Sequence, residues 1–293
     1  MSIIHLLPSH VANQIAAGEV IQRPASAVKE MLENALDAGS TEIKLFIQDA
    51  GRTILHVVDN GCGMSPKDMK MCFQRHATSK IKTADDLFNI QSMGFRGEAM
   101  ASIAAIAHIE IKSKLIEQEL GSNLVLKGSE IISQEDCATA NGTSIKIKNL
   151  FYNVPARRKF LKSDQVEMRH ITQEFIRIAL GNPKVKMQFY NNKNELFHLP
   201  ASNFRQRIIN IIGTKKNEYL VPIEEETSLV KITGFIGKPQ AAKKTRGEQY
   251  FFVNKRFIKS NYLQHAVNKA FEEVIPQNYF PSYFINLNIN PKF

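Results

Sequence analysis

The stretch RPASAVKEMLENALDAG, residues 23–39, decides the fold of the first part of the chain. Pro24 stands where a helix can begin, and Gly39 where one can end. Between them, hydrophobic residues recur at helical spacing on one face. The opposite face carries Glu30, Glu33, Asn34 and Asp37. Such a polar face is ordinarily solvated, but Glu30 and Asn34 lie four residues apart and could together position a water and bind Mg²⁺.

A glycine-containing loop follows the next two expected strands. Residues 43–47 and 54–58 alternate in hydrophobicity around the turn DAGR and predict a hairpin. The hairpin leads into DNGCG, residues 59–63. Asp59 could accept a hydrogen bond from a ligand amino group, while Gly63 lets the backbone pack closely. A glycine-rich turn after a strand is the ordinary alternative, and the motif alone leaves both readings open.

A second glycine motif, GFRGEAM, spans residues 94–100 and leads into a helix expected over 98–107. Backbone N–H groups at a helix N-terminus bind anions, so the motif is a candidate phosphate site. It is no Walker A loop, because no Gly-Lys-Ser/Thr follows, and no Rossmann motif, because no strand precedes it. The polar segment RHATSK, residues 75–80, is a candidate lid over the same phosphates.

Composition and charge limit the class of protein. The 293 residues suggest two domains, and we place the boundary near residue 200, giving 1–200 and 201–293. Residues 201–293 hold 14 basic and 7 acidic residues of a chain with net charge +10. This basic part indicates either a polyanionic partner or a solvated basic surface. Three cysteines without zinc spacing indicate reduced thiols in a cytosolic protein. Neither a signal peptide nor an apolar run long enough to cross a membrane is expected.

Two basic clusters are candidates for contact with nucleic-acid phosphates, although charge runs are ordinarily solvated. The candidates are Arg157, Arg158, Lys159, Lys243, Lys244, Arg246, Arg256 and Lys259. Aromatic residues are interleaved with the second cluster, where they either stack on bases or form part of the core. The interleaved aromatics are Tyr250, Phe251, Phe252 and Phe257.

The order of expected elements predicts an α/β (α+β) two-layer sandwich. Strands that are adjacent in sequence dominate the first unit, so its sheet should be mixed, largely antiparallel, with helices on one face. The second unit should contain helices over 204–212 and 262–274 and strands over 229–237, 249–253 and 283–289.

Taken in order, residues 30–39, 59–64, 94–99 and 141–143 resemble the motifs of the GHKL (Bergerat) ATPases. The stretches ANQIAAGEV at 12–20, RHATSK at 75–80 and LFYNVPARRKF at 150–160 are similar to the DNA mismatch-repair members of that family. The resemblance is dense over residues 5–165 and thinner towards the C-terminus. It implies an ATP-binding domain followed by a transducer-type domain.

The resemblance also implies residue roles. Glu30 would be the general base, and Asn34 the Mg²⁺ ligand. Asp59 and Thr143 would contact adenine, and a backbone turn with a lid would wrap the phosphates. The implied ATP-binding set is Asn34, Asp59, Gly63, Thr78, Ser79, Lys80, Gly94, Phe95, Arg96, Gly97, Glu98, Ala99, Met100 and Thr143.

The implied function is slow ATP hydrolysis used as a conformational switch. Residues 12–20 would order on ATP binding and join two chains in a homodimer. The implied partners are DNA, a MutS-type mismatch sensor and a downstream nuclease or helicase, in the bacterial cytoplasm at the nucleoid. A histidine kinase would need a phosphoacceptor helix, and a type II topoisomerase would not carry residues 75–80 and 152–160 as they stand.

One departure from the family concerns the second domain. There the family has a His-Pro-x-Lys turn whose lysine reaches the γ-phosphate, and Lys292 does not match it. We therefore expect the chain to be an N-terminal part of a longer protein that retains nucleotide binding. The alternative to an active ATPase is a nucleotide- and DNA-binding scaffold without turnover.

Overall fold

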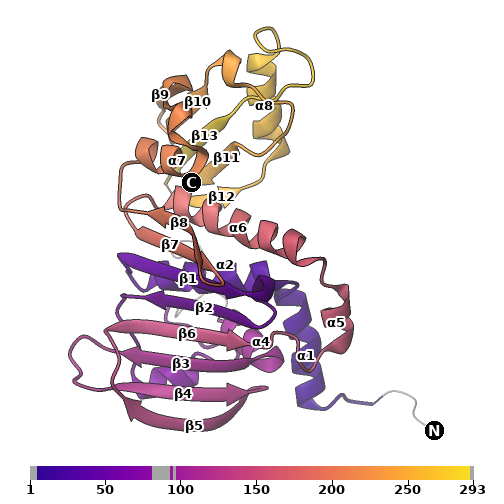
Figure 1. Cartoon of the computed structure of the whole chain (residues 1–293), viewed down its shortest axis with the longest axis vertical. Helices are drawn as coiled ribbons and strands as arrows, with labels where there is room; N and C mark the ends of the chain where they lie inside the picture. The colour runs from indigo at the N-terminus through magenta and orange to yellow at the C-terminus, as the bar shows by residue number, and fades with distance from the viewer. Residues whose placement is uncertain (1–4, 81–92, 95–96, 291–293) are drawn as a thin grey trace. The chain divides into compact units, whose positions relative to one another are not determined.

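The computed structural model describes residues 5–80, 93–94 and 97–290 (Figure 1). The chain divides into two compact units. Unit 1 comprises Met1–Phe175 and Val185–His198, and unit 2 comprises Ile176–Lys184 and Leu199–Phe293.

Unit 1 is built on an eight-stranded sheet with the order β5-β4-β3-β6-β2-β1-β7-β8. β1 and β7 run parallel, whereas β1–β2, β2–β6, β6–β3, β3–β4 and β4–β5 are antiparallel. The predicted mixed, largely antiparallel sheet is therefore confirmed. Its strands are β1 (Glu42–Gln48), β2 (Ile54–Asp59), β3 (His108–Lys114), β4 (Gly121–Lys127), β5 (Glu130–Cys137), β6 (Gly142–Lys148), β7 (Lys186–Asn191) and β8 (Asn194–Leu199).

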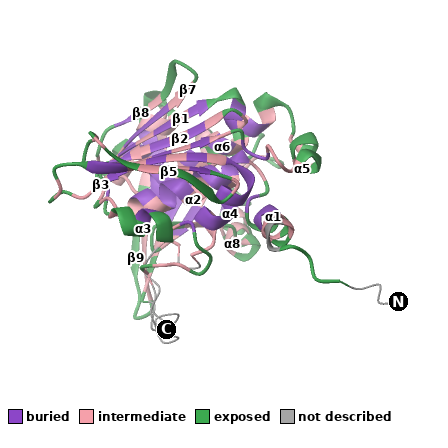
Figure 2. Cartoon of the chain, turned by 90° about the horizontal axis from the view of Figure 1, so that it is seen from below, coloured by how far each residue is buried: buried purple, intermediate pink, exposed green. Residues whose placement is uncertain are grey.

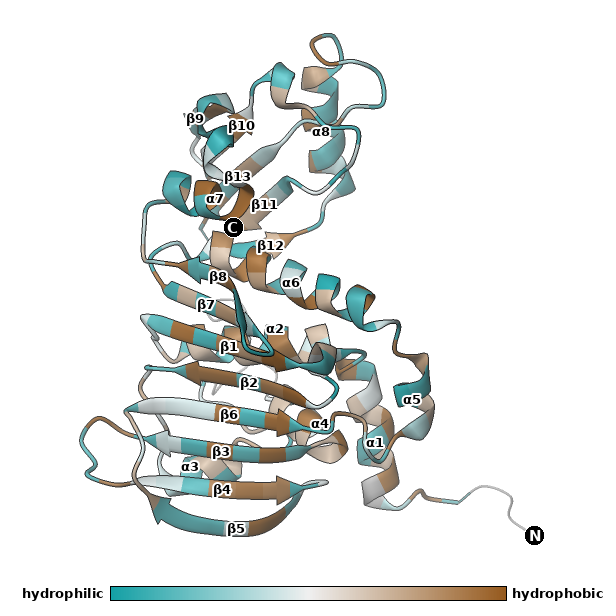
Figure 3. Ribbon diagram, viewed as in Figure 1, coloured by the Kyte–Doolittle hydropathy of each residue, from teal (hydrophilic) through white to brown (hydrophobic). Residues whose placement is uncertain are grey.

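Helices cover one face of this sheet. Figure 2 shows α2, α3 and α4 on the same side of the strands. In β1, Ile43, Leu45 and Ile47 are fully buried, while the residues between them are not. Central β2 is mostly hydrophobic and edge strand β5 mostly hydrophilic (Figure 3). The helices that begin in unit 1 are α1 (Ser9–Val20), α2 (Pro24–Asp37), α3 (Pro66–Met71), α4 (Ala99–Ile106), α5 (Pro155–Phe160) and α6 (Asp164–Gly181).

Helix α2 begins at Pro24, as its sequence predicts, and buries Val28, Met31 and Leu32. Its polar face is less solvated than expected, because Glu30, Asn34 and Asp37 are half-buried and Glu33 is buried. Glu33 is only 5% exposed. Its carboxylate is paired with the ammonium group of Lys29, one turn earlier.

Unit 2 holds a five-stranded sheet with the order β12-β11-β13-β10-β9, in which β11 and β13 run parallel. Helix α7 (Phe204–Ile212) matches its predicted range, and α8 spans Asn261–Phe271. Short 3₁₀ turns lie at Asp49–Gly51 in unit 1 and at Thr214–Tyr219 and Pro239–Ala241 in unit 2. The strands are β9 (Leu220–Glu226), β10 (Val230–Gly237), β11 (Gln249–Val253), β12 (Arg256–Ile258) and β13 (Tyr283–Ile289).

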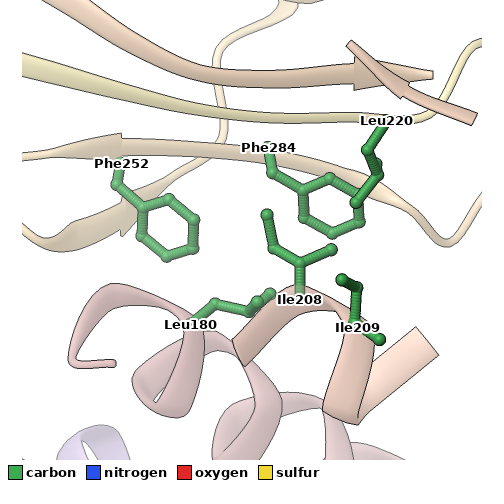
Figure 4. Packing of buried hydrophobic residues seen from close by; sticks show 6 residues of the cluster. All are labelled: Leu180, Ile208, Ile209, Leu220, Phe252 and Phe284. Carbon is green, nitrogen blue, oxygen red and sulfur yellow. The ribbon is translucent and has the colours of Figure 1, made fainter. Parts of the chain in front are cut away.

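The core of unit 2 forms where the end of α6 and α7 pack on this sheet (Figure 4). Phe252 and Phe284 are fully buried there, and Tyr250 and Phe257 pack around them. Phe251 lies in a second buried cluster with Tyr283. The interleaved aromatics of the sequence are therefore core residues. The buried cluster in Figure 4 comprises Leu180, Ile208, Ile209, Leu220, Phe252 and Phe284.

No helix in the described part of the chain is both long and apolar enough to cross a membrane.

Candidate functional site

The polar face of α2, which carries Asn34 and Asp37, contacts a lysine from a distant segment. Lys80 Nζ lies 3.1 Å from Asn34 Oδ1 and 2.5 Å from Asp37 Oδ2. The side chains of Lys80 and Asp37 are only 21% and 12% exposed, so this ion pair is shielded from solvent. The proposed Mg²⁺ ligand and the proposed lid lysine are thus neighbours in the folded chain.

Asp37 also ties the second glycine motif to α2. Its carboxylate accepts hydrogen bonds from the backbone N–H groups of Met93, at 2.8 Å, and Gly94, at 3.2 Å. Phe95 and Arg96 lie outside the described residues. Gly97 has φ +63°, and a Cβ there would come within 2.5 Å of the carbonyl oxygen of Ala77. The two segments that should enclose phosphates therefore touch, and only glycine fits at their contact.

The remaining lid and turn residues lie around this contact. Thr78 Oγ1 accepts a hydrogen bond from the backbone N–H of Lys80, at 3.2 Å, and Ser79 is exposed. Glu98 precedes α4, and its carboxylate lies 3.4 Å from His76 Nδ1. Ala99 and Met100 begin α4, with Met100 buried.

A buried carboxylate marks the other end of the site. Asp59 ends β2 and is 9% exposed. Its Oδ1 accepts a hydrogen bond from the N–H of Gly61, at 2.8 Å, and lies 3.2 Å from the hydroxyl of Ser40. Burial raises the pKa of Asp59, although hydrogen bonds from Gly61, Ser40 and the backbone of Thr143 oppose the shift. The amino group of a nucleotide base could donate a hydrogen bond to such a carboxylate.

Thr143 lies directly opposite Asp59 in the pairing of β2 with β6. Its hydroxyl is 2.9 Å from Ser113 Oγ, which belongs to β3. Gly63 lies at this end of the site and has φ +72°. A Cβ there would come within 2.2 Å of the Lys114 carbonyl oxygen. Any larger residue would push the loop away from β3.

Glu30 lies one turn before Asn34 on α2, and its Oε1 is 3.2 Å from Lys29 Nζ. The carboxylates of Glu30 and Glu33 outweigh the effect of burial and raise the pKa of Lys29, so this lysine is cationic at neutral pH. Glu30 also lines a cavity of about 320 Å³. The other lining residues are Val20, Arg23, Ala25, Ser26, Lys29, His170 and Glu174.

The protein oxygens of this region could supply only some of the ligands of a metal ion. No group of three or more His, Cys, Asp or Glu side chains in the described ranges could hold a metal ion by itself. Mg²⁺ typically uses one or two protein oxygens, with phosphates and waters completing its shell. Asn34 Oδ1, next to Asp37, fits that pattern once Lys80 moves away.

The basic candidates fall into two groups. Arg157 donates a hydrogen bond to the carbonyl of Gly18, at 2.7 Å, near the end of α1, and Lys243 is paired with Glu248. These two side chains therefore have bonds within the chain. The exposed candidates are Arg158, Lys159, Lys244, Arg246, Arg256 and Lys259.

Five residues described for the site were not among the sequence candidates: Lys29, Glu33, Asp37, Ser40 and Ser113. The spacing of Asp37, three residues after Asn34 on the same helix face, was a usable signal. Ser113 gave none, because its place beside Thr143 depends on the β3–β6 register.

Comparison with known proteins gives two family matches. Residues 22–154 match the model of histidine kinase-, DNA gyrase B- and HSP90-like ATPases. Residues 208–293 match the model of the DNA mismatch repair protein C-terminal domain.

Among curated relatives, the chain is 60% identical over 290 residues to the DNA mismatch repair protein MutL of Christiangramia forsetii. It is 54% identical over 289 residues to MutL of Parabacteroides distasonis. Each match covers 99% of this chain and 47% of the relative. The chain therefore spans about half the length of the curated relatives it matches.

Solved structures share the fold. The Aquifex aeolicus MutL ATPase domain complexed with ADP superposes with a TM-score of 0.71 at 23% identity, covering 93% of this chain and 94% of that one. The N-terminal domain of a DNA repair protein gives a TM-score of 0.83 at 23% identity, covering 96% and 87%. Both likenesses support the two-layer α/β architecture.

Proposed function

Because the chain belongs to the MutL family of DNA mismatch repair proteins and carries its GHKL-type ATPase region, we propose that it binds and slowly hydrolyses Mg-ATP as a conformational switch. The observation that carries this proposal is the contact of Lys80 with Asn34 and Asp37. This contact places the candidate lid, residues 75–80, against the polar face of α2. The buried carboxylate of Asp59 lies at the end of the neighbouring strand β2.

The nucleotide would lie between these two ends. Its adenine amino group donates to Asp59, with the hydroxyl of Thr143 close by. The phosphates accept hydrogen bonds from the ammonium group of Lys80 and from backbone N–H groups of the motif at 94–100. When bound, Mg²⁺ neutralises phosphate charge beside Asn34. An ADP complex of a MutL relative with the same fold supports nucleotide binding in this domain.

Glu30 is proposed as the general base. Its carboxylate takes a proton from water while the water oxygen bonds to the γ-phosphorus and the bond between that phosphorus and the β–γ bridging oxygen breaks. ADP and inorganic phosphate leave. Most of the acceleration comes from positioning and from neutralising phosphate charge, and a positioned base typically adds about 10²–10⁴-fold.

The switch follows from the competition for Lys80. Without nucleotide, its ammonium group binds Asn34 and Asp37. Phosphates compete for the same ammonium group, and Mg²⁺ competes for Asn34 Oδ1. Nucleotide binding therefore releases Lys80 from Asn34 and Asp37 of α2. Residues 12–20 are already helical as part of α1, so we propose that this change repositions α1 and promotes a homodimer.

The proposed partners are DNA, a MutS-type mismatch sensor and a downstream nuclease or helicase, with the protein acting in the bacterial cytoplasm at the nucleoid. Membership of the mismatch repair family supports DNA as the substrate of the pathway. Exposed basic residues on each unit supply candidate phosphate contacts.

Phosphate release from the purified chain tests the ATPase proposal. We expect slow turnover that disappears when EDTA removes Mg²⁺, because the γ-phosphate charge is then not neutralised. The measurement is inorganic phosphate produced at saturating ATP. A Glu30→Ala preparation, purified in the same way, controls for contaminating ATPases. Binding of a non-hydrolysable ATP analogue with no phosphate release would instead favour the scaffold without turnover.

Filter binding of a single-stranded oligonucleotide across a salt series tests the DNA proposal. We expect the logarithm of affinity to fall with the logarithm of salt concentration by about 0.7 per phosphate contact. Reversing Arg158 and Lys159 to glutamate should weaken binding and flatten this slope by about 1–2. Reversal of Lys67 and Lys70, two exposed lysines of α3, is the matched control. A slope near zero in the unmodified chain contradicts phosphate contact.

A further inference from the structure

A lysine beside the proposed base is held by a buried carboxylate. Lys29 Nζ lies 3.0 Å from Glu33 Oε2 and 3.2 Å from Glu30 Oε1. The Glu33 side chain is 7% exposed, whereas that of Glu30 is 28% exposed. A carboxylate as buried as Glu33 requires a charged or hydrogen-bonding partner. Glu33 therefore fixes the ammonium group, and the ammonium group in turn holds the more exposed carboxylate of Glu30.

The surroundings of Glu30 explain why it needs such a restraint. Glu30 lines the cavity of about 320 Å³, which leaves open space beside its side chain. Arg23 lines the same cavity and offers a competing positive charge. A general base acts only within hydrogen-bond reach of its proton, about 2.6–3.2 Å between heavy atoms. Displacement of a catalytic group by about 1 Å can reduce a rate about 10²-fold.

We propose that Lys29, anchored by Glu33, is a positioning residue for ATP hydrolysis that holds the Glu30 carboxylate in its productive orientation. This inference rests on the proposed role of Glu30 as the general base. Lys29 acts through Glu30, and its loss should lower the rate of the chemical step without weakening nucleotide binding.

The test compares Lys29→Met with Lys29→Arg. Methionine keeps most of the aliphatic stem and removes the charge, while arginine keeps the charge and the donors. Lys29→Met should lower kcat about tenfold or more and leave the Kd for a non-hydrolysable ATP analogue within twofold. Lys29→Arg should restore most of kcat. Lys44→Met is the matched control, because Lys44 is also ion-paired, to Glu42, with 41% of its side chain exposed against 38% for Lys29.

A second variant distinguishes a loss of catalysis from a loss of folding. Lys29→Met leaves the buried carboxylate of Glu33 without this partner, which can destabilise α2. The double variant Lys29→Met/Glu33→Gln removes that charge and still leaves Glu30 without its ammonium partner. It should show the same loss of kcat with an analogue Kd near that of the unmodified chain.

The outcomes separate this inference from the proposed function. If Glu30→Gln hydrolyses ATP normally, the role of Glu30 is wrong. If Glu30→Gln is inactive but Lys29→Met and the double variant keep full or higher kcat, the role of Lys29 is overturned. Equal loss of kcat and analogue binding, without recovery in Lys29→Arg, also overturns it, because Lys29 then only supports the helix.

Discussion

Replacing Glu30 with alanine is expected to lower ATP turnover by about 10²–10⁴-fold while leaving ATP binding intact. The carboxylate contributes to the transition state, in which it receives the proton of the attacking water. It contributes little to the bound ground state, because a carboxylate gains nothing from proximity to phosphate charge. Phosphate release at saturating ATP and titration with a non-hydrolysable analogue measure the two effects separately.

The control replaces a carboxylate outside the site. Glu110 lies on β3 in an ion pair with Lys148, 2.7 Å away, and Glu110→Ala should leave turnover unchanged. If Glu30→Ala bound the analogue as poorly as Asn34→Ala, Glu30 would be part of the binding site and its assignment as the base would be wrong.

The sequence predicted the elements with strong periodicity. Helix α2 was predictable because Pro24 marks its start and its buried face is regular. Strand β9 was missed because LVPIEEE contains Pro222 and three glutamates. β9 is an edge strand of the five-stranded sheet, where an unpaired side tolerates proline and charge. Helix α5, with six residues and none of them buried, lacks any periodic signal.

The candidate site was predictable only as separate motifs. Asp59, Gly63 and Asn34 stand out locally, because a carboxylate at a strand end, a glycine loop and a polar helix face each suggest ligand chemistry. The contact of Lys80 with Asp37 joins residues 43 positions apart and depends on how the lid folds over α2. The burial of Glu33 runs against its place on the polar face. Long-range packing, which no local pattern encodes, determines both features.

Replacing Asn34 with alanine is expected to weaken Mg-ATP binding by about 10- to 100-fold, because a polar group bonded to a charged partner typically contributes about 1.5–3 kcal/mol. Two effects oppose each other in this variant. The metal loses a protein oxygen, but Lys80 also loses one of its partners in the nucleotide-free chain. Lys80 remains bound to Asp37, so the gain from its release is partial and the loss of the metal ligand dominates.

Titration of a non-hydrolysable ATP analogue with Mg²⁺ and with EDTA distinguishes these effects. With EDTA, Asn34→Ala should bind the analogue as tightly as the unmodified chain or slightly more tightly, because neither can use the metal and Lys80 has one partner fewer to leave. With Mg²⁺, only the unmodified chain should gain affinity. If Asn34→Ala gained as much from Mg²⁺ as the unmodified chain, Asn34 would not be the metal ligand. An equal loss with and without Mg²⁺ would instead place the amide against the nucleotide itself.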